Sequence, residues 1–428
     1  MAGERAVVSF KNVGLNDAAD AFLGALFVGC RAGLVFILFD DCDIQHSQNR
    51  VDVRHYFSIY GGLWFDPRNV EEAYKFTRNA FLYSERFGIP VVIRITNILF
   101  DHGLHFSPDF ERETLPRQQF ECLRRYENKS PYVVHPSEAL GMEERLFTKN
   151  QEIKEFVETL YSDAGTAFSL EIVYGAKRNI MVNHPLRLYT LPLPEKILKS
   201  AFAGVPMRSI AIYEHGQTPF VAQQINSILM EGCCVSCNMP PNAGFHSKYH
   251  NNTYMEKLFS ALRKQGAIIC GDLGGFTMDP SRTLHLCLCY GVSVAVSMGV
   301  GEVAKKHNKK VFCVTGDAAF LHSGQQCLYE MQERGINASI FVLENGGALG
   351  TGGQHIPGDL LSCPAEVRLQ EWDYSGITDV TLEDMVGGLP EHGINLIIVH
   401  THEQESKKFI KLVNKGFSEE KYDQNHSH

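Results

Sequence analysis

The fold of this chain is decided by two stretches, 310-KVFCVTGD-317 and 338-ASIFVLENGG-347. Each opens with an apolar run that is typical of a strand buried on both faces of a sheet. The segment between them carries apolar residues at helical spacing and ends at Gly335, where a glycine suits the end of a helix. Two buried strands joined by one helix predict a parallel βαβ unit.

Polar residues stand at the carboxyl ends of both predicted strands, Asp317 after the first and Asn345 after the second. Ligands of open α/β sheets bind at this edge. A carboxylate, an amide oxygen and a nearby backbone carbonyl are the hard ligands that Mg²⁺ prefers, often beside phosphate oxygens. Glycines next to both residues allow the backbone to approach a diphosphate. Either residue alone is more often a cap or turn residue, but the pair at this spacing indicates a metal–diphosphate site.

Apolar strands and amphipathic helices alternate along the rest of the chain. Strands are predicted at 34–39 and 90–95, with an amphipathic helix over 70–87 between them. This pattern predicts an α/β protein with three doubly wound parallel-sheet domains. We place these domains at residues 1–110, 151–232 and 233–428, with a connection over 111–150 and a frayed tail over 418–428.

The composition is that of a folded protein in a reducing compartment. The 428 residues are 44% hydrophobic, which excludes a disordered chain, and the net charge of −9 argues against nucleic acid or an anionic membrane as partner. No signal peptide precedes the first apolar run, so a cytoplasmic location is expected. Four cysteines lie in apolar runs and are expected to be small buried hydrophobes: Cys270, Cys287, Cys289 and Cys313.

The apolar stretch 21–39 is similar in hydrophobicity to a membrane-spanning helix. Turn formers and Arg31 interrupt it between Gly29 and Gly33. Two short buried elements therefore fit better than one spanning helix: a helix to about Val28 and a strand from Leu34.

Several segments resemble one family of thiamine diphosphate enzymes. Gly316-Asp317-Ala318, 26 further residues and then Asn345 are similar to the thiamine diphosphate motif, with alanine in place of its third glycine. Four more segments look like the α subunits of indolepyruvate:ferredoxin oxidoreductases: 271-GDLGGFT-277, 291-GVS-293, 320-FLHSG-324 and 351-TGGQ-354. Segments within 13–54 are similar to the pyrimidine-side domain of that family, and 191-LPLPEK-196 and 219–224 to its transketolase-C-like middle domain.

The resemblance implies an enzyme that uses thiamine diphosphate and Mg²⁺ on a 2-oxo acid, with an aromatic, indolepyruvate-like acid as the expected substrate. Such an enzyme decarboxylates the substrate to a cofactor-bound enamine. It also implies that Asp317, Asn345 and the backbone carbonyl of Gly347 hold the metal. The residues implied to line the cofactor are Gly271, Asp272, Gly274, Gly316, Asp317, Ala318, Asn345, Gly347 and Thr351.

Three further residues are implied to act in catalysis. His322 would lie beside the diphosphate or the substrate, to orient it or to transfer a proton, with a purely structural histidine as the alternative. Gln48 and Asn49, next to Ser47, would face the pocket from the pyrimidine side, unless they only form a turn after a strand.

The chain departs from the family pattern at both ends. The pyrimidine-side domain of the family begins earlier and carries there the glutamate that activates the cofactor, so another chain is expected to supply that segment and its glutamate. We therefore expect a homo- or hetero-oligomer. The family also ends in a ferredoxin-like module that has no counterpart before His428.

Cys234 and Cys237 match a C-x-x-C that helps to hold an iron–sulfur cluster in related pyruvate oxidoreductases. A [4Fe–4S] cluster wants four thiolates, and the partner cysteine expected after Gly274 is Gly275 here. We therefore expect no cluster on this chain, and we do not expect these cysteines to bind zinc either.

Three functions follow from these departures. The leading hypothesis is a non-oxidative decarboxylase or carboligase, in which the enamine is protonated or transferred to an acceptor. The second is a subunit of a 2-oxo acid:ferredoxin oxidoreductase whose clusters and activating glutamate are on a partner chain. The third is an inactive subunit that only binds the cofactor or acts as a scaffold.

Overall fold

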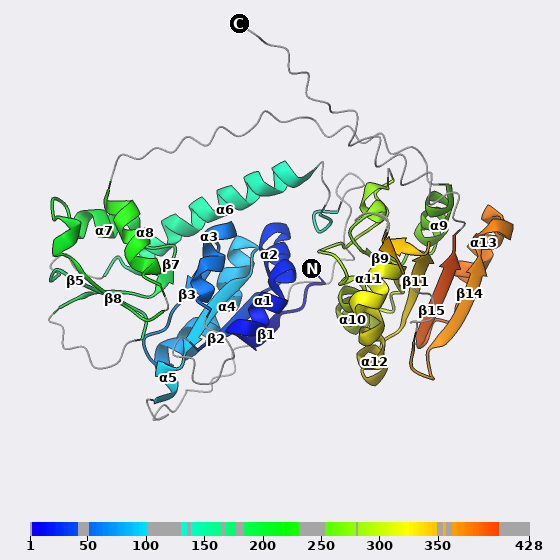
Figure 1. Cartoon of the computed structure of the whole chain (residues 1–428), viewed down its shortest axis with the longest axis horizontal. Helices are drawn as coiled ribbons and strands as arrows, with labels where there is room; N and C mark the ends of the chain where they lie inside the picture. The colour runs from blue at the N-terminus through cyan, green and yellow to red at the C-terminus, as the bar shows by residue number, and fades with distance from the viewer. Residues whose placement is uncertain are drawn as a thin grey trace, which may run out of the picture. The chain divides into compact units, whose positions relative to one another are not determined.

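A computed structural model describes eleven segments of the chain: residues 2–41, 51–101, 130–134, 138–163, 168–176, 184–216, 218–230, 253–279, 281–348, 354–356 and 362–401. Contacts between Cα atoms divide the chain into two compact units (Figure 1). Unit 1 holds Gly3–Phe120 and Leu140–Ala243, and unit 2 holds Glu121–Ala139 and Gly244–His428.

The first sheet of unit 1 has the strand order β1-β2-β4-β3-β7. Its strands are β1 (Ala6–Lys11), β2 (Leu34–Asp40), β3 (Leu63–Phe65), β4 (Val91–Thr96) and β7 (Thr190–Leu191). All neighbours are parallel except β7, which runs antiparallel to β3. The strands predicted at 34–39 and 90–95 are therefore confirmed as β2 and β4.

Helices of unit 1 begin and end where local signals favour it. The predicted helix over 70–87 is confirmed as α4 (Val70–Phe87), which Asn69 caps through its side chain and which ends at Gly88 in the left-handed conformation. The apolar stretch 21–39 divides into α2 (Ala19–Val28) and β2, as predicted. In the described part of the chain no helix is both long and apolar enough to cross a membrane. The remaining short helices here are α1 (Asn12–Asp17), α3 (Phe57–Tyr60) and α5 (Ile98–Asp101), with the 3₁₀ turn η1 (Val53–Tyr56).

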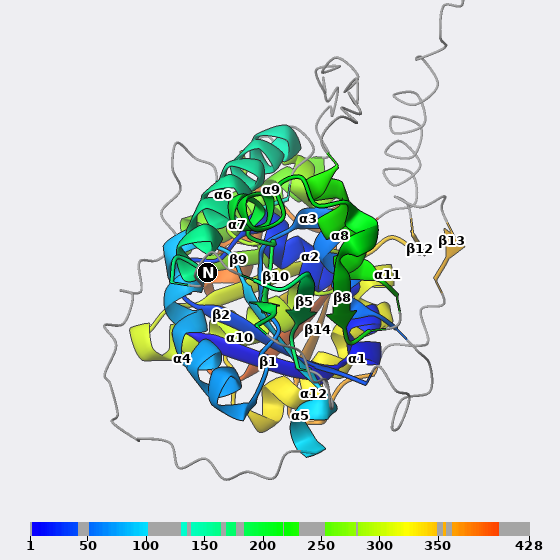
Figure 2. The ribbon, with the colours of Figure 1, turned by 90° about the vertical axis from the view of Figure 1, so that its left-hand side faces the viewer.

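The second sheet of unit 1 has the parallel order β6-β5-β8, made of Leu186–Leu188, Glu171–Tyr174 and Ala211–Glu214. It carries α7 (Glu195–Ala201) and α8 (Phe220–Leu229). The long helix α6 (Ala139–Leu160) runs through residue 150, where the sequence predicts a boundary, and lies beside α7 (Figure 2). One hydrophobic core includes residues of both sheets, among them Val35, Trp64 and Leu188.

The sheet of unit 2 has the all-parallel order β14-β15-β11-β10-β9 (Figure 1). In that order the strands are Arg368–Asp373, Ile394–His400, Ala338–Glu344, Val311–Gly316 and Ile268–Gly271. Helix α10 (Ser293–Ala304) packs on this sheet and against α12 (Gln325–Glu333), while α9 (Thr253–Lys264) packs against α13 (Asp379–Gly387). The four cysteines expected to be buried are at most 2% exposed, as predicted.

Three sheets of parallel strands with helices packed against them confirm the predicted α/β class. The antiparallel strand β7 is the exception in the first sheet. The three domain ranges given by the sequence stay predictions.

Candidate functional site

Three strand ends of unit 2 bring the candidate residues to one edge of the sheet. In the parallel register Val314 of β10 lies opposite Gly271 of β9, and Gly316 lies opposite Leu343 of β11. Asp272, Asp317 and Asn345 each follow one of these strands at its carboxyl end. The structure therefore brings these residues together at the edge where open α/β sheets bind ligands.

The Asp317 carboxylate is buried and accepts hydrogen bonds from the backbone alone. Its Oδ1 accepts from the Ala318 amide at 2.7 Å, and its Oδ2 from the amides of Asn345 at 3.1 Å and Gly346 at 2.9 Å. Burial raises the pKa of Asp317, and the negative charge of Glu344 adds to this, although the three amides oppose it. None of the ion pairs in the described residues includes Asp317, so no positive side chain there compensates the charge of its ionised form.

Asn345 lies at the start of a turn that exposes backbone. Its Oδ1 accepts from the Gly347 amide at 3.2 Å, and Gly346 has φ +72° with open space around its missing Cβ. Gly347 begins β12 (Gly347–Ala348), which pairs antiparallel with β13 (Gln354–His355). The cross-strand bond runs from the Ile356 amide to the Gly346 carbonyl, so the peptide groups of Gly347 point away from β13.

These groups fit a hard divalent cation. A carboxylate has about four lone-pair sites, of which the three amides occupy three on Asp317. The Asn345 Oδ1 has accepted one bond, and the Gly347 carbonyl is not used by the β12–β13 pair. One acid oxygen, one amide oxygen and one backbone carbonyl are thus available on adjoining segments, and this donor set suits Mg²⁺ with water and phosphate oxygens.

The Asp272 carboxylate is buried and accepts hydrogen bonds from neighbouring segments of unit 2. It is 1% exposed, and its Oδ1 accepts from the Gly291 amide at 2.6 Å. Its Oδ2 accepts from the hydroxyls of Ser293 at 2.6 Å and Thr315 at 3.0 Å. Burial raises the pKa of Asp272 despite these bonds. The side chain therefore joins β9, the end of β10 and the start of α10 beside Asp317.

The glycines and Ala318 differ in what they provide. A Cβ on Gly271 would lie 2.6 Å from Leu284, so this position is closed by packing. Gly274 has φ +126° with nothing within 4 Å of a Cβ, and Gly316 has only Phe276 at 4.0 Å, so both present bare backbone. Ala318 lies inside the helical turn α11 (Asp317–Ala319), where no positive φ is needed, which explains why alanine is suitable there.

His322 is exposed on the π-helical segment η6 (Phe320–Gly324) that follows Asp317. Its ring lies 6.0 Å from that of Tyr290, and the neighbouring Ser323 hydroxyl donates to the Gly291 carbonyl. Tyr290 is 43% exposed, and its pKa is raised by partial burial and by the charges of Asp272 and Asp317. Tyr290 was not predicted from the sequence, although its position directly before the 291-GVS-293 segment could have indicated it.

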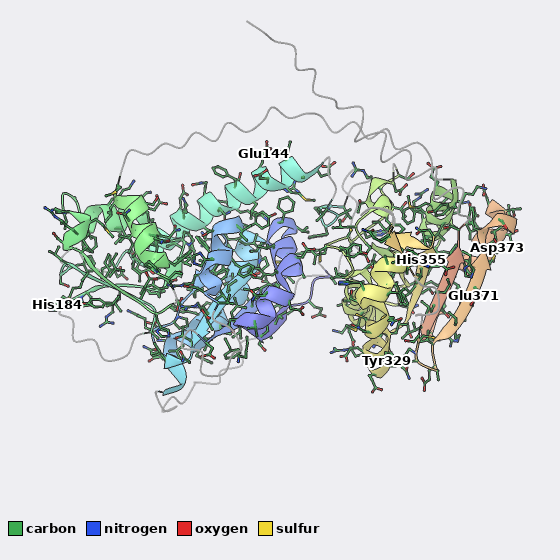
Figure 3. The ribbon with its side chains drawn as sticks, viewed as in Figure 1. Glu144, His184, Tyr329, His355, Glu371 and Asp373 are labelled. Atoms are coloured by element: carbon green, nitrogen blue, oxygen red, sulfur yellow. The ribbon has the colours of Figure 1, made fainter. Side chains whose placement is uncertain are left out.

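A second polar group at the same edge was also missed. His400, at the end of β15, contacts Glu344 through Nδ1 and lies 3.5 Å from Glu371 through Nε2. Burial alone would lower the pKa of His400, but the two glutamates raise it. Figure 3 shows Glu371 and Asp373 on β14, the strand next to β15. These residues come together only through the parallel register of β11, β15 and β14.

Other predicted site residues lie outside the described segments. These are Ser47, Gln48, Asn49 and Thr351, together with Cys234 and Cys237.

Residues 272–416 match the family model for the thiamine pyrophosphate enzyme, C-terminal TPP binding domain. The match begins at Asp272 and includes Asp317 and Asn345. The matched residues also contain strands β10 and β11, whereas β9 lies directly before them.

The chain is also similar to curated relatives over most of its length. It is 25% identical over 84% of its residues to indolepyruvate oxidoreductase subunit IorA of Archaeoglobus fulgidus, and covers 66% of that protein. To the subunit of the same name from Methanothermobacter marburgensis it is 24% identical over 89% of its residues, covering 69% of that protein. The chain thus spans about two thirds of the length of these relatives.

Among solved structures, a thiamine diphosphate-dependent 4-hydroxybenzoylformate decarboxylase from Rhodococcus jostii RHA1 aligns with a TM-score of 0.47 and 13% identity. That alignment covers 94% of this chain and 88% of the decarboxylase, but it is too distant to bear on the site. Residues 272–416 are thus similar to the C-terminal TPP binding domain of thiamine pyrophosphate enzymes, and most of the chain is similar to the IorA subunits.

Proposed function

We propose that the chain binds thiamine diphosphate through Mg²⁺ at the carboxyl edge of β9, β10 and β11, and acts there on a 2-oxo acid. The observation that carries this proposal is the placement of Asp317 and Asn345 on adjoining strand ends within a matched TPP-binding domain. Their oxygens keep capacity for a cation.

In this proposal Asp317, Asn345 and the carbonyl of Gly347 hold the metal. A metal held there would supply positive charge for the diphosphate, and Gly274 and Gly316 would let the backbone approach the diphosphate without side-chain obstruction. Asp272 does not touch the cofactor in this scheme. It is a positioning residue, because its carboxylate bonds to the segments that carry Gly291, Ser293 and Thr315.

Thiamine diphosphate, when bound, supplies a nucleophilic carbon and an electron sink for decarboxylation. The chain's own residues orient the substrate and manage protons near that centre. His322 is exposed beside Tyr290, within the segment that follows Asp317, and is the candidate to hold or move a proton at its imidazole. Gln48, Asn49 and Thr351 remain proposed contributors.

The names of the relatives favour an oxidoreductase subunit as the role of the chain. Two curated relatives are indolepyruvate oxidoreductase subunits, and this supports an aromatic, indolepyruvate-like substrate and a partner chain that takes the electrons. In this version the iron–sulfur clusters and the activating glutamate are on the partner.

A non-oxidative decarboxylase is the second candidate, and one observation favours it. The residue after Gly274 is Gly275, and the four cysteines nearest in the fold, Cys270, Cys287, Cys289 and Cys313, are buried in the core. Burial raises the pKa of Cys270, Cys287 and Cys313, which makes these thiols poor ligands. These three buried thiols are therefore unsuited to hold a cluster at this edge.

The first test is calorimetric titration of the full chain with thiamine diphosphate and Mg²⁺, for the wild type and for Asp317→Ala. We expect the variant to lose at least about tenfold in affinity, because a metal ligand is removed. Asp379→Ala is the matched control, since Asp379 is an exposed acid that pairs with Lys257 on the surface of α13. Equal affinities for the wild type and Asp317→Ala would contradict the proposed metal site.

The partner and the fate of the electrons need a second measurement. We expect the native complex to contain iron and to reduce an electron acceptor when the 2-oxo acid is added. Release of an aldehyde by an iron-free preparation would instead support the non-oxidative alternative. Absence of cofactor binding with and without the co-purified partner would leave the inactive scaffold.

A further inference from the structure

The carboxyl edge of the first sheet in unit 1 carries charged residues on one face. Asp40 of β2 lies opposite Thr96 of β4 in the register, and Arg94 lies two residues before Thr96. Phe65 of β3 lies opposite Ile93, so Asp66 follows beside Arg94. Since side chains alternate along a strand, Asp40, Arg94, Thr96 and Asp66 share one face of three neighbouring strands.

The Arg94 guanidinium forms hydrogen bonds with two carboxylates. Its Nε donates to the Asp40 Oδ2 at 2.6 Å and its Nη1 to the Asp66 Oδ2 at 2.7 Å. The third donor, Nη2, reaches the carbonyl of His215 beyond β8 at 2.9 Å. All three charged side chains are at most 4% exposed. One guanidinium therefore faces two buried acids, and ionisation of both would leave a net charge of −1 away from water.

The described surroundings do not supply the missing positive charge. Within the described segments, the Asp40 Oδ1, the Thr96 hydroxyl and the Tyr174 hydroxyl are buried and have no hydrogen-bond partner. The neighbouring Arg54 guanidinium is already bound to two acids of its own, Asp52 and Glu214. Among the described residues, the charged and titratable groups that face the cluster are Asp40, Asp52, Arg54, Arg94, Tyr174, Glu214 and His215.

We propose that the Asp40–Arg94–Asp66 triad binds one proton, held on the Asp66 carboxyl, at the junction of the two sheets of unit 1. A neutral acid on Asp66 leaves one carboxylate for one guanidinium, and the triad is then electrically neutral. Burying an unpaired charge is far more unfavourable than burying a neutral acid.

A second buried aspartate in the same unit shows the contrast. The Asp52 carboxylate accepts hydrogen bonds from the Nε and Nη2 of Arg54, at 2.8 and 2.6 Å, and from the Thr218 hydroxyl. Burial would raise the pKa of Asp52, but the bonds and charge of Arg54 hold it well below the usual range. Burial raises the pKa of Asp66 as well, and there the shared Arg94 does not reverse the shift.

Loss of the proton to solvent weakens the junction. Arg94 then holds two ionised acids, and Asp40 and Asp66 repel each other across it. Because the pKa of Asp66 is higher in the folded than in the unfolded chain, its contribution to stability is complete below about pH 4 and is lost as the pH rises through the raised value. Asp52 has the opposite sign, and its contribution is lost only as the pH falls below about 4.

The test compares unfolding of the full chain with that of Asp66→Asn, which imitates the neutral acid. The chain has two tryptophans, so a Trp372→Phe background leaves Trp64 of β3 as the fluorescent reporter of unit 1. Above about pH 4, the ordinary aspartate pKa, we expect the denaturation midpoint of the parent to fall relative to Asp66→Asn as the pH rises through the raised pKa of Asp66. Asp52→Asn is the matched control, which we expect to lower the midpoint by the same amount across this range. A midpoint difference between the parent and Asp66→Asn that does not change with pH would overturn the proposal.

A spectroscopic measurement on the folded protein detects the proton directly. In the infrared difference between the parent and Asp66→Asn, which removes the bands of other buried acids, we expect the band of a protonated carboxyl at a pH above the ordinary aspartate pKa of about 4, and its disappearance as the pH rises further. In Asp40→Asn the Asp66 carboxyl has Arg94 to itself, so we expect the same difference band to be lost there. Absence of the band from the parent, or its persistence in Asp40→Asn, would show that Asp66 does not hold the proton.

Discussion

The carboxyl edges of the two units carry similar acids but surround them with different partners. In unit 1, Asp52 and Asp40 are bound to the guanidinium groups of Arg54 and Arg94. In unit 2, Asp317 and Asp272 accept hydrogen bonds from backbone amides and hydroxyls, which carry no net charge. Neutral donors hold a carboxylate in place without cancelling its charge. The edge of unit 2 can therefore attract a cation, whereas that of unit 1 is already paired.

The largest expected effect comes from breaking the pairing in unit 1. Arg54→Met removes a fully buried guanidinium and leaves Asp52 and Glu214 without it, so we expect a loss of about 3–5 kcal/mol in the free energy of unfolding. Denaturant titration followed by the fluorescence of Trp64 measures this loss. Lys75→Met is the control, because Lys75 forms an exposed pair with Glu71 in the same unit and is expected to change stability by less than about 1 kcal/mol. Similar effects of the two substitutions would mean that the buried pairing of unit 1 contributes little.

The neutral donors of unit 2 are tested by a smaller change. Thr315→Val keeps the shape of the side chain but removes one of the two hydroxyls that bond to Asp272 Oδ2. Leaving a buried acceptor without its donor costs about 1–3 kcal/mol in the free energy of unfolding. We expect this loss in the denaturation of unit 2, which the fluorescence of Trp372 follows. Thr381→Val is the control in the same unit, since its exposed hydroxyl pairs with that of Thr378 at the start of α13. If Thr315→Val were as mild as this control, Asp272 would not depend on its hydroxyl partners.

The sequence predicted two of the three strands that form this edge, with Asp317 and Asn345 at their ends, and the family resemblance implied Asp272 as well. The runs before Asp317 and Asn345 are apolar and long, so β10 and β11 are evident from their pattern, and the spacing of the two polar residues places them at one edge. Strand β3 has only three residues, and β14 is mostly exposed and polar, so neither has a readable pattern.

Contacts that depend on strand order and register could not be predicted from the sequence. Asp272 meets Thr315 because β9 and β10 are neighbours, and Arg94 meets Asp40 and Asp66 because β4 lies between β2 and β3. No local spacing encodes these pairs, because the partners are separated by whole helices and loops. The pattern of a strand predicts its end, but only the strand order predicts what lies beside that end.

The smallest expected effect concerns the backbone that carries the amides around Asp317. The Gly346 amide donates to Asp317 at φ +72°, with nothing within 4 Å of an added Cβ. Gly346→Ala therefore meets no steric clash, and its expected cost is the left-handed conformation alone, about 1 kcal/mol. Gly299→Ala is the matched control, because Gly299 also has open space but lies inside helix α10, where alanine is favoured by about 1 kcal/mol. Denaturation followed by Trp372 is expected to move in opposite directions for the two alanines. If both stabilised unit 2, the turn after β11 would relax freely, and the amides that hold Asp317 with its charge intact would not be fixed in place.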